Sequence, residues 1–156
     1  MAVKKLKDFL DRNGVEYIAI KHSPAYTAQK IAALAHVKGR FLAKPVMVKL
    51  DGRMVMAVLP SKYRVDLEAL RDATRAGQAE LAHESEFAHL FPNCDTGAEP
   101  PFGNLWNMPV YVDRTLTQDE TIAFSAGSHS ELLQLSYTDY ARLVEPEVLS
   151  FSQPER

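Results

Sequence analysis

The sequence predicts an α/β fold of the α+β kind, in which residues 1–156 form one domain around a mixed, mostly antiparallel central sheet with surrounding helices. Three observations favour this fold. The chain has 156 residues, of which 46% are apolar and 24% charged, and this is typical of a globular domain with its own core. A hairpin pattern occupies residues 43–59. Segments with helical spacing alternate with further strand patterns on both sides of it.

The hairpin is expected to lie inside the sheet. Asp51-Gly52 separates two apolar runs, and this dipeptide favours a type I′ turn because both central residues need positive φ. A two-residue turn fixes the register, so Val48 faces Val55 and Lys44 faces Leu59. Because side chains alternate, Lys44 shares one face with Val48, and both faces of the hairpin are largely apolar. We therefore expect the sheet to be covered on both sides.

The remaining elements follow from hydrophobic spacing and from start and stop residues. Helices are expected over residues 3–10, stopped by Asn13-Gly14, over 28–36, over 66–73 with Asp66 as cap, over 81–91, and after the cap Ser136. Strands are expected over residues 15–21, 109–113, 121–125 and 131–135. Residues 60–64 are interpreted as a basic connector. The tail from Pro146 is expected either to fray or to dock through Val148, Leu149 and Phe151.

Charge and cysteine content limit the class of protein. Residues 1–75 carry 15 basic and 7 acidic side chains, a net charge of +8, whereas the remainder carries 3 and 13, a net charge of −10. Either an anionic partner such as RNA meets the first half, or both halves mix their charges on one folded surface. Cys94 is the only cysteine, which excludes an intrachain disulfide and favours a reducing compartment. Without a signal-peptide pattern or a bilayer-spanning apolar run, we expect a cytoplasmic protein.

Common catalytic and metal-binding motifs are absent from the sequence. It contains no P-loop, no dinucleotide fingerprint and no Gly-x-Ser-x-Gly motif. The five histidines and the single cysteine lack the spacing of a zinc site, so we expect no metal and no cofactor. Cys94 is a lone loop cysteine, and such residues are more often incidental than nucleophilic.

Three features remain as candidate sites. Lys44 has a core-facing position, so its ammonium group either reaches past the apolar side chains to water or serves a function. The loop over residues 92–107 is rich in glycine and proline: either its backbone N–H groups stabilise an oxyanion, or it is a surface connection. The turn Ala126–His129 presents a histidine that either contacts a phosphate, ribose or carbonyl oxygen, or is an ordinary structural residue.

Taken together, these features resemble the YbaK/ProRS-associated domain family. The matching segments are His22-Ser23-Pro24, Ala43-Lys44-Pro45-Val46, Val65-Asp66-Leu67, the Gly97-x-x-x-Pro101 loop with Phe102-Gly103, and Ser125-Ala126-Gly127-Ser128-His129. The family comprises editing domains inserted in some prolyl-tRNA synthetases and free-standing relatives that hydrolyse mischarged aminoacyl-tRNA. The resemblance implies a free-standing deacylase that acts in trans, on tRNA-Pro or a similar tRNA carrying a small non-cognate amino acid.

The resemblance also implies site residues and partners. Lys44 and Gly97 match catalytic positions of the family. The implied substrate-binding residues are Pro101, Phe102, Gly103, Gly127, Ser128 and His129. The implied partner is the 3′ end of an aminoacyl-tRNA, with prolyl-tRNA synthetase or another synthetase as a further candidate; DNA and membranes are not expected partners.

These candidate residues are sufficient for hydrolysis of an aminoacyl ester, because the ester is already activated. The reaction needs only a positioned water and a stabilised oxyanion. In this hypothesis Lys44 holds the acceptor end and the backbone of residues 97–103 binds the reacting carbonyl. We therefore expect the Lys44 amine at the mouth of a buried cleft, next to this glycine-rich bend. Two alternatives stay open. One is a non-catalytic module that binds an RNA 3′ end or a synthetase. The other is a small-molecule ester hydrolase, which the lack of a Ser-His or Cys-His pair disfavours.

Overall fold

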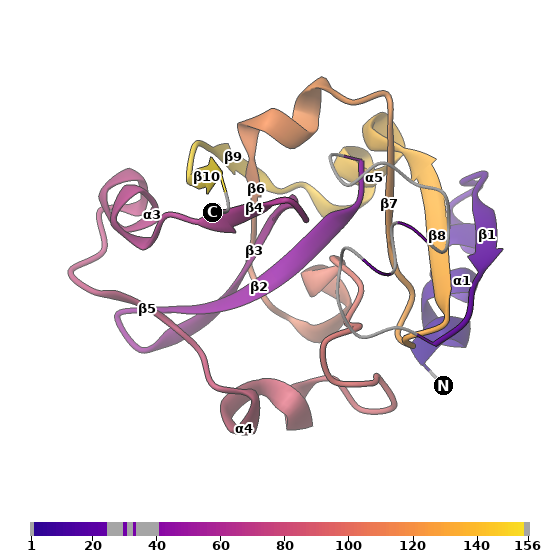
Figure 1. The fold of residues 1–156 in the computed structure, drawn as a ribbon, viewed down its shortest axis with the longest axis horizontal. Coiled ribbons are helices and arrows are strands. Elements are labelled where there is room, and N and C mark those ends of the chain that lie inside the picture. The colour runs from indigo at the N-terminus through magenta and orange to yellow at the C-terminus, as the bar shows by residue number, and fades with distance from the viewer. Residues whose placement is uncertain (1, 25–29, 31–32, 34–40, 155–156) are drawn as a thin grey trace.

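A five-stranded mixed sheet forms the centre of the computed structural model, which describes residues 2–24, 30, 33 and 41–154 (Figure 1). In sheet order its strands are β5 (Ala79–Leu81), β2 (Ala43–Leu50), β3 (Arg53–Pro60), β6 (Val110–Asp113) and β9 (Glu147–Leu149). The pairs that involve β2 are antiparallel, whereas β3 with β6 and β6 with β9 are parallel. The predicted mixed sheet is therefore confirmed.

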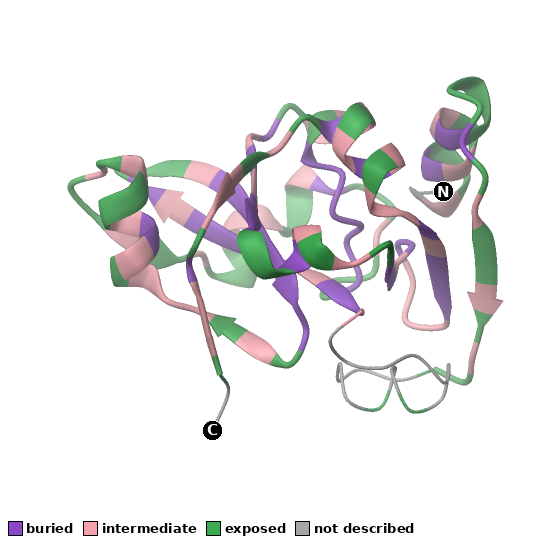
Figure 2. Cartoon of the chain, turned by 90° about the horizontal axis from the view of Figure 1, so that it is seen from above, coloured by how far each residue is buried: buried purple, intermediate pink, exposed green. Residues whose placement is uncertain are grey.

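Two smaller antiparallel sheets accompany the central one. The three-stranded sheet has the order β1 (Ile18–Lys21), β8 (Glu131–Ser136) and β7 (Thr121–Ser125). The two-stranded sheet pairs β10 (Ser152–Pro154) with β4 (Tyr63–Val65). A parallel bridge between Leu42 and Ala123 joins the start of β2 to β7. Figure 2 shows β1 as an exposed edge and β3 as largely buried.

Short helices surround these sheets. They are α1 (Ala2–Arg12), α3 (Leu67–Thr74), α4 (Glu84–Phe87) and α5 (Tyr137–Val144), with the 3₁₀ helices η1 (Ala88–Leu90), η2 (Gly103–Trp106) and η3 (Arg114–Gln118). Figure 1 places α1 beside the three-stranded sheet and α3 at the opposite end of the molecule. Among the described residues, no helix is long and apolar enough to cross a membrane. The helix predicted over residues 28–36 lies almost entirely outside the described residues.

The β2–β3 hairpin confirms the predicted register and the predicted two-sided burial. Val48 pairs with Val55, and Lys44 pairs with Leu59. Val48 and Val55 belong to one apolar cluster, whereas Met47 on the other face belongs to a second cluster. Each face of the hairpin thus packs against its own set of apolar side chains.

Two predicted helix caps are also confirmed. The Asp66 carboxylate accepts a hydrogen bond of 3.0 Å from the Ala69 N–H at the start of α3. The Ser136 hydroxyl oxygen accepts one of 3.1 Å from the Asp139 N–H at the start of α5. Both caps satisfy backbone donors that lack a partner within the helix.

Some expected elements differ in the structure. Residues 60–64 are not only a connector, because Tyr63–Val65 forms β4. The helical segment expected over residues 81–91 begins later and is divided between α4 and η1, while Leu81 ends β5. The first strand begins at Ile18 rather than at residue 15. Very short strands carry little periodicity, so their partners decide where they form.

The expectation of a frayed tail is wrong, and the alternative that the tail docks is confirmed. Residues 147–154 form β9 and β10, and Phe151 between them is 1% exposed. The buried Asp113 carboxylate, at the end of β6, accepts hydrogen bonds from the backbone N–H groups of Phe151 (2.8 Å) and Ser152 (3.0 Å). It also accepts bonds from the Ser152 hydroxyl (2.9 Å) and the Thr115 N–H (3.1 Å). One carboxylate therefore fastens the tail to the sheet.

Candidate functional site

Two loops that are distant in the sequence meet at one place, which we call the loop junction: residues 95–99 and residues 126–130. The Asp95 N–H donates to the Gly127 carbonyl at 2.9 Å, and the Gly127 N–H donates to the Ala98 carbonyl at 2.9 Å. These reciprocal backbone bonds hold the predicted glycine-rich loop against the predicted histidine turn. The structure thus brings together two of the three candidate features.

His129 is fixed at this junction through its backbone and its ring. Its N–H donates to the Asp95 carboxylate at 3.2 Å, and its Nε2 lies 2.9 Å from the Thr96 carbonyl oxygen. Because a carbonyl oxygen only accepts, this contact favours the tautomer with the proton on Nε2. The imidazole is therefore held in one orientation.

Gly97 packs its backbone against the His129 ring. Its φ of +93° lies in the region that L side chains rarely adopt, and the same holds for Gly127 at +110°. A Cβ atom on Gly97 would lie 3.5 Å from His129 Cε1, which is ordinary van der Waals contact. Backbone conformation, rather than lack of space, therefore demands glycine at position 97.

Glu99 is a residue of this loop that the sequence reasoning missed. It is 4% exposed, and the Gly97 N–H donates to both of its carboxylate oxygens, at 3.1 and 3.2 Å. Burial raises the pKa of Glu99 above its ordinary value, while the N–H groups of Glu99 itself and of Gly97 oppose that rise. A single acid between an alanine and a proline has no periodic signal that would have identified it.

Pro101, Phe102 and Gly103 form the buried base of the loop. The Tyr140 hydroxyl donates to the Pro101 carbonyl at 2.7 Å. The Phe102 ring is fully buried and lies edge-on to Tyr140, with ring centroids 5.2 Å apart. A Cβ atom on Gly103 would lie 2.7 Å from the Met108 carbonyl oxygen. Phe102 offers no exposed side-chain surface to a substrate, so its contribution is to packing beneath the loop.

Ser128 lies beside a different cavity from Lys44. Ser128 lines a cavity of about 640 Å³ together with Lys7 and Glu131, whose charged groups lie 2.7 Å apart. Its hydroxyl lies 3.4 Å from the Ser130 hydroxyl. A substrate entering this cavity would meet the histidine turn at Ser128.

Lys44 is partly buried and lines a cavity of about 450 Å³. Its Nζ donates to the Ser61 carbonyl at 3.0 Å, so the amine is not turned to bulk solvent. Val46, Arg64 and Leu81 share the cavity, and no acidic side chain is among its described lining residues. The described lining residues also include none from the loop junction. The described lining of the Lys44 cavity thus does not reach the glycine-rich bend beside which the amine was expected, and we treat Lys44 and the junction as two separate parts of the candidate site.

The described residues offer few side chains for nucleophilic or metal-assisted catalysis. Burial raises the pKa of Cys94 to about 11, with the charges of Glu99 and Asp95 adding to the rise, so at neutral pH the side chain is a thiol rather than the nucleophilic thiolate. In residues 2–24 and 41–154, no group of three His, Cys, Asp or Glu side chains is placed to hold a metal ion.

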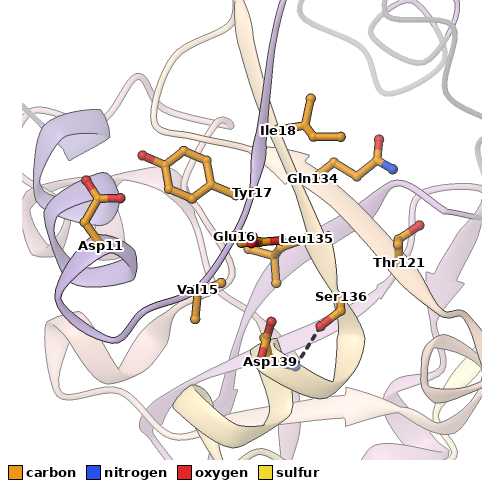
Figure 3. Close-up of a pocket in the computed structure, with 10 residues that line it drawn as sticks. All are labelled: Asp11, Val15, Glu16, Tyr17, Ile18, Thr121, Gln134, Leu135, Ser136 and Asp139. Atoms are coloured by element: carbon orange, nitrogen blue, oxygen red, sulfur yellow. Dashed lines mark hydrogen bonds between the residues drawn. The ribbon is translucent and has the colours of Figure 1, made fainter.

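Figure 3 shows a further cavity, of about 800 Å³, between α1, β1, β8 and α5. Three acidic side chains line it, those of Asp11, Glu16 and Asp139. None of the predicted site residues is among the lining residues. An acidic lining opposes the approach of RNA phosphates, so this cavity suits an RNA terminus less well than the Lys44 cavity, whose described lining residues include no acid.

The family assignment rests on a match along most of the chain. A sequence profile described as "Aminoacyl-tRNA editing domain" matches residues 22–143, a range that contains Lys44 and both loops of the junction. The chain belongs to the aminoacyl-tRNA editing domain family. This confirms the predicted family and the predicted class of enzyme, a hydrolase of the aminoacyl ester bond.

Individual relatives of this editing domain agree with the assignment. The chain is 28% identical over 156 residues to the "Multifunctional Ser/Thr-tRNA deacylase ProXp-y" of Escherichia coli K12, with 95% of this chain and 91% of the relative covered. The solved hypothetical protein APE2540 matches with a TM-score of 0.85 at 22% identity, over 96% of this chain and 99% of its own.

A second solved structure, described as a candidate trans-editing enzyme for prolyl-tRNA synthetase, matches with a TM-score of 0.81 at 17% identity and covers 97% of both chains. At these low identities the two solved structures show the fold alone. They confirm the mixed α/β architecture of the editing domain.

Proposed function

We propose that this editing domain hydrolyses, in trans, the ester bond of a tRNA that carries a small non-cognate amino acid. The observation that carries the proposal is the loop junction, where the Gly97 backbone is held in a positive-φ conformation against His129 within the matched family range. Serine and threonine are the first amino acids to test, because the Escherichia coli relative is named for tRNAs carrying them. tRNA-Pro is the first acceptor to test, since the resemblance to the prolyl-tRNA synthetase editing domains suggested it.

In the proposed mechanism the Gly97 N–H donates to the carbonyl oxygen of the ester as negative charge develops on it. An aminoacyl ester is reactive enough that a positioned water then completes the hydrolysis. His129, fixed by Asp95 and Thr96, contacts the terminal ribose or its phosphate. Gly127 and Ser128 hold the turn that presents this histidine.

Lys44 has an electrostatic role in this proposal. Its amine and the Arg64 guanidinium line one cavity whose described lining contains no acid, and this suits a phosphate of the acceptor end. Phosphate contacts position a nucleic acid without reading its sequence, so Lys44 contributes to holding the substrate rather than to choosing the amino acid. We also propose prolyl-tRNA synthetase as a partner of the protein and the cytoplasm as its location.

The test is a deacylation assay with tRNAs charged with radiolabelled serine, threonine, alanine or cysteine. We expect the protein to release at least one of these amino acids. Lys44→Ala should lower kcat/KM about tenfold or more, mainly through KM, because it removes a charge-assisted contact with the substrate. Adding prolyl-tRNA synthetase to the assay tests that partner.

Arg71→Ala is the matched control, because it removes one positive charge from the exposed face of α3 and leaves Lys44 in place. Unchanged release by Lys44→Ala would remove Lys44 from the mechanism. Binding of charged tRNA without release would favour the non-catalytic module. Neither binding nor release would leave a small-molecule esterase, which model esters would detect.

A further inference from the structure

We propose that Glu99 is the general base of ester hydrolysis in this domain: the substrate carbonyl replaces the Glu99 carboxylate at the Gly97 N–H, and the displaced carboxylate accepts a proton from the attacking water. This inference rests on the proposed function, because it concerns the same loop junction and the same backbone donor.

The geometry gives Glu99 and the substrate carbonyl a shared partner. The Gly97 N–H already donates to the Glu99 carboxylate, at 3.1 and 3.2 Å from its two oxygens. A carbonyl oxygen that binds this N–H must therefore take the place of the carboxylate. Because Glu99 is only two residues from Gly97, its displaced carboxylate stays beside the reacting carbon. There it can accept a proton from a water molecule.

Burial of the Glu99 carboxylate costs free energy of folding, and a function at this position would explain why the domain tolerates that cost. Glu99 is 4% exposed, and no ion pair to its carboxylate occurs among the described residues. Burial also raises its pKa, which makes the carboxylate a stronger base than an exposed one. Local violations of folding preference of this kind concentrate at functional sites.

The titratable groups around Glu99 come from three elements. Glu84 of α4 raises the pKa of Glu99 through charge repulsion, and His129 of the turn lowers it. Cys94 of the same loop remains a thiol at neutral pH and therefore carries no charge. Asp95 lies at the junction and is engaged by the His129 N–H.

The proposed reaction balances in protons and bonds. The water oxygen forms a bond to the ester carbon while one water proton moves to the Glu99 carboxylate. The carbonyl oxygen carries the resulting negative charge, and the Gly97 N–H stabilises it. When the intermediate collapses, the bond from carbon to the ribose oxygen breaks and that oxygen takes the proton from Glu99. The products are the free amino acid and the uncharged tRNA, and Glu99 is again ionised.

Glu99→Gln tests the proposal with little change of shape. The amide oxygen can still accept from the Gly97 N–H, and no buried charge remains, so the melting temperature should be no lower than that of the wild type. Single-turnover rates are measured from about pH 5 to about pH 8 on the substrate that the wild type hydrolyses, with the enzyme-free rate subtracted. The wild-type rate should rise with pH to a plateau, as Glu99 loses its proton. Glu99→Gln should lower that plateau about 10²-fold or more and abolish the rise.

Two further variants separate a catalytic from a structural role. Glu99→Asp keeps a base at the position, so the rise with pH should persist at a lower plateau. Glu84→Gln removes a charge that raises the pKa of Glu99, so the rise should move to lower pH while the plateau is unchanged.

Two results would overturn the inference. One is a plateau for Glu99→Gln within threefold of the wild type. The other concerns an N-acetylated aminoacyl-tRNA, which has no α-ammonium group. If Glu99→Gln hydrolyses this substrate as fast as the wild type does, the role of Glu99 is to bind the α-ammonium group of the normal substrate. Both results leave the proposed function standing, which fails only if the wild type hydrolyses no aminoacyl-tRNA.

Discussion

Asp113→Ala lowers the free energy of unfolding by about 3–5 kcal/mol, the largest effect on stability that we expect. The buried carboxylate accepts hydrogen bonds from the N–H groups of Phe151, Ser152 and Thr115. It also accepts them from the hydroxyls of Ser152 and Thr115. Removing it leaves several of these donors without an acceptor, and Phe151 then loses its anchor in the core. Denaturant unfolding followed by tryptophan fluorescence measures the change.

Asp72→Ala is the control for this prediction. Asp72 is exposed, and its only side-chain partner among the described residues is the neighbouring Arg71, so we expect a change within about 0.5 kcal/mol. The pH dependence gives a second check. Burial alone would raise the pKa of Asp113, but the hydrogen bonds it accepts outweigh burial and lower the pKa below the ordinary 3.8. Its stabilisation is therefore present above pH 3.8 and is lost as the pH falls through the lowered value. A stability gap between wild type and Asp113→Asn that stayed constant below that pH would contradict this account.

Gly97→Ala lowers kcat for deacylation about 10²-fold, the effect seen when an oxyanion donor is misplaced. The alanine side chain has room beside His129, but it disfavours the backbone φ of +93° that aims the N–H at the substrate. The loop therefore relaxes and the donor turns away. Single-turnover deacylation with saturating enzyme measures the loss.

Gly52→Ala is the matched control, since Gly52 has a φ of +82° in the hairpin turn and nothing lies within 4 Å of an added Cβ atom. Both substitutions carry a similar backbone penalty of about 1–2 kcal/mol. Only the change at Gly97 should affect catalysis. Equal losses of activity in the two variants would show that stability, and not the position of the Gly97 N–H, accounts for the effect.

The parts of the fold that the sequence predicted are those with strong local signals. Asp51-Gly52 dictates a two-residue turn, and that turn alone fixes the pairing of Lys44 with Leu59. Ser136 and Asp66 are caps whose side chains suit a helix start in almost any context. Family resemblance identified Gly97 and His129 as separate candidate residues, whereas only the structure shows that their two loops meet and that Gly97 lies against His129.

The parts that the sequence did not predict depend on contacts between distant segments. Strands β4, β5, β9 and β10 have three residues each, too few for an alternating pattern, and they exist because a partner strand supplies their hydrogen bonds. Glu99 and Asp113 were overlooked for a related reason. Acids in loops and at strand ends are usually exposed, so only the folded structure shows that these two are buried.

Pairing of the last strands with early ones has a consequence for biosynthesis. Residues 152–154 pair with residues 63–65, and residues 147–149 pair with residues 111–113. A ribosome makes the chain from its N-terminus, so β4 lacks its partner strand β10, and the Asp113 carboxylate lacks three of its donors, until residues 147–154 leave the exit tunnel. A nascent chain stalled before that point should expose the β4 edge to chaperones and proteases, and its maturation should be completed only after translation of this segment.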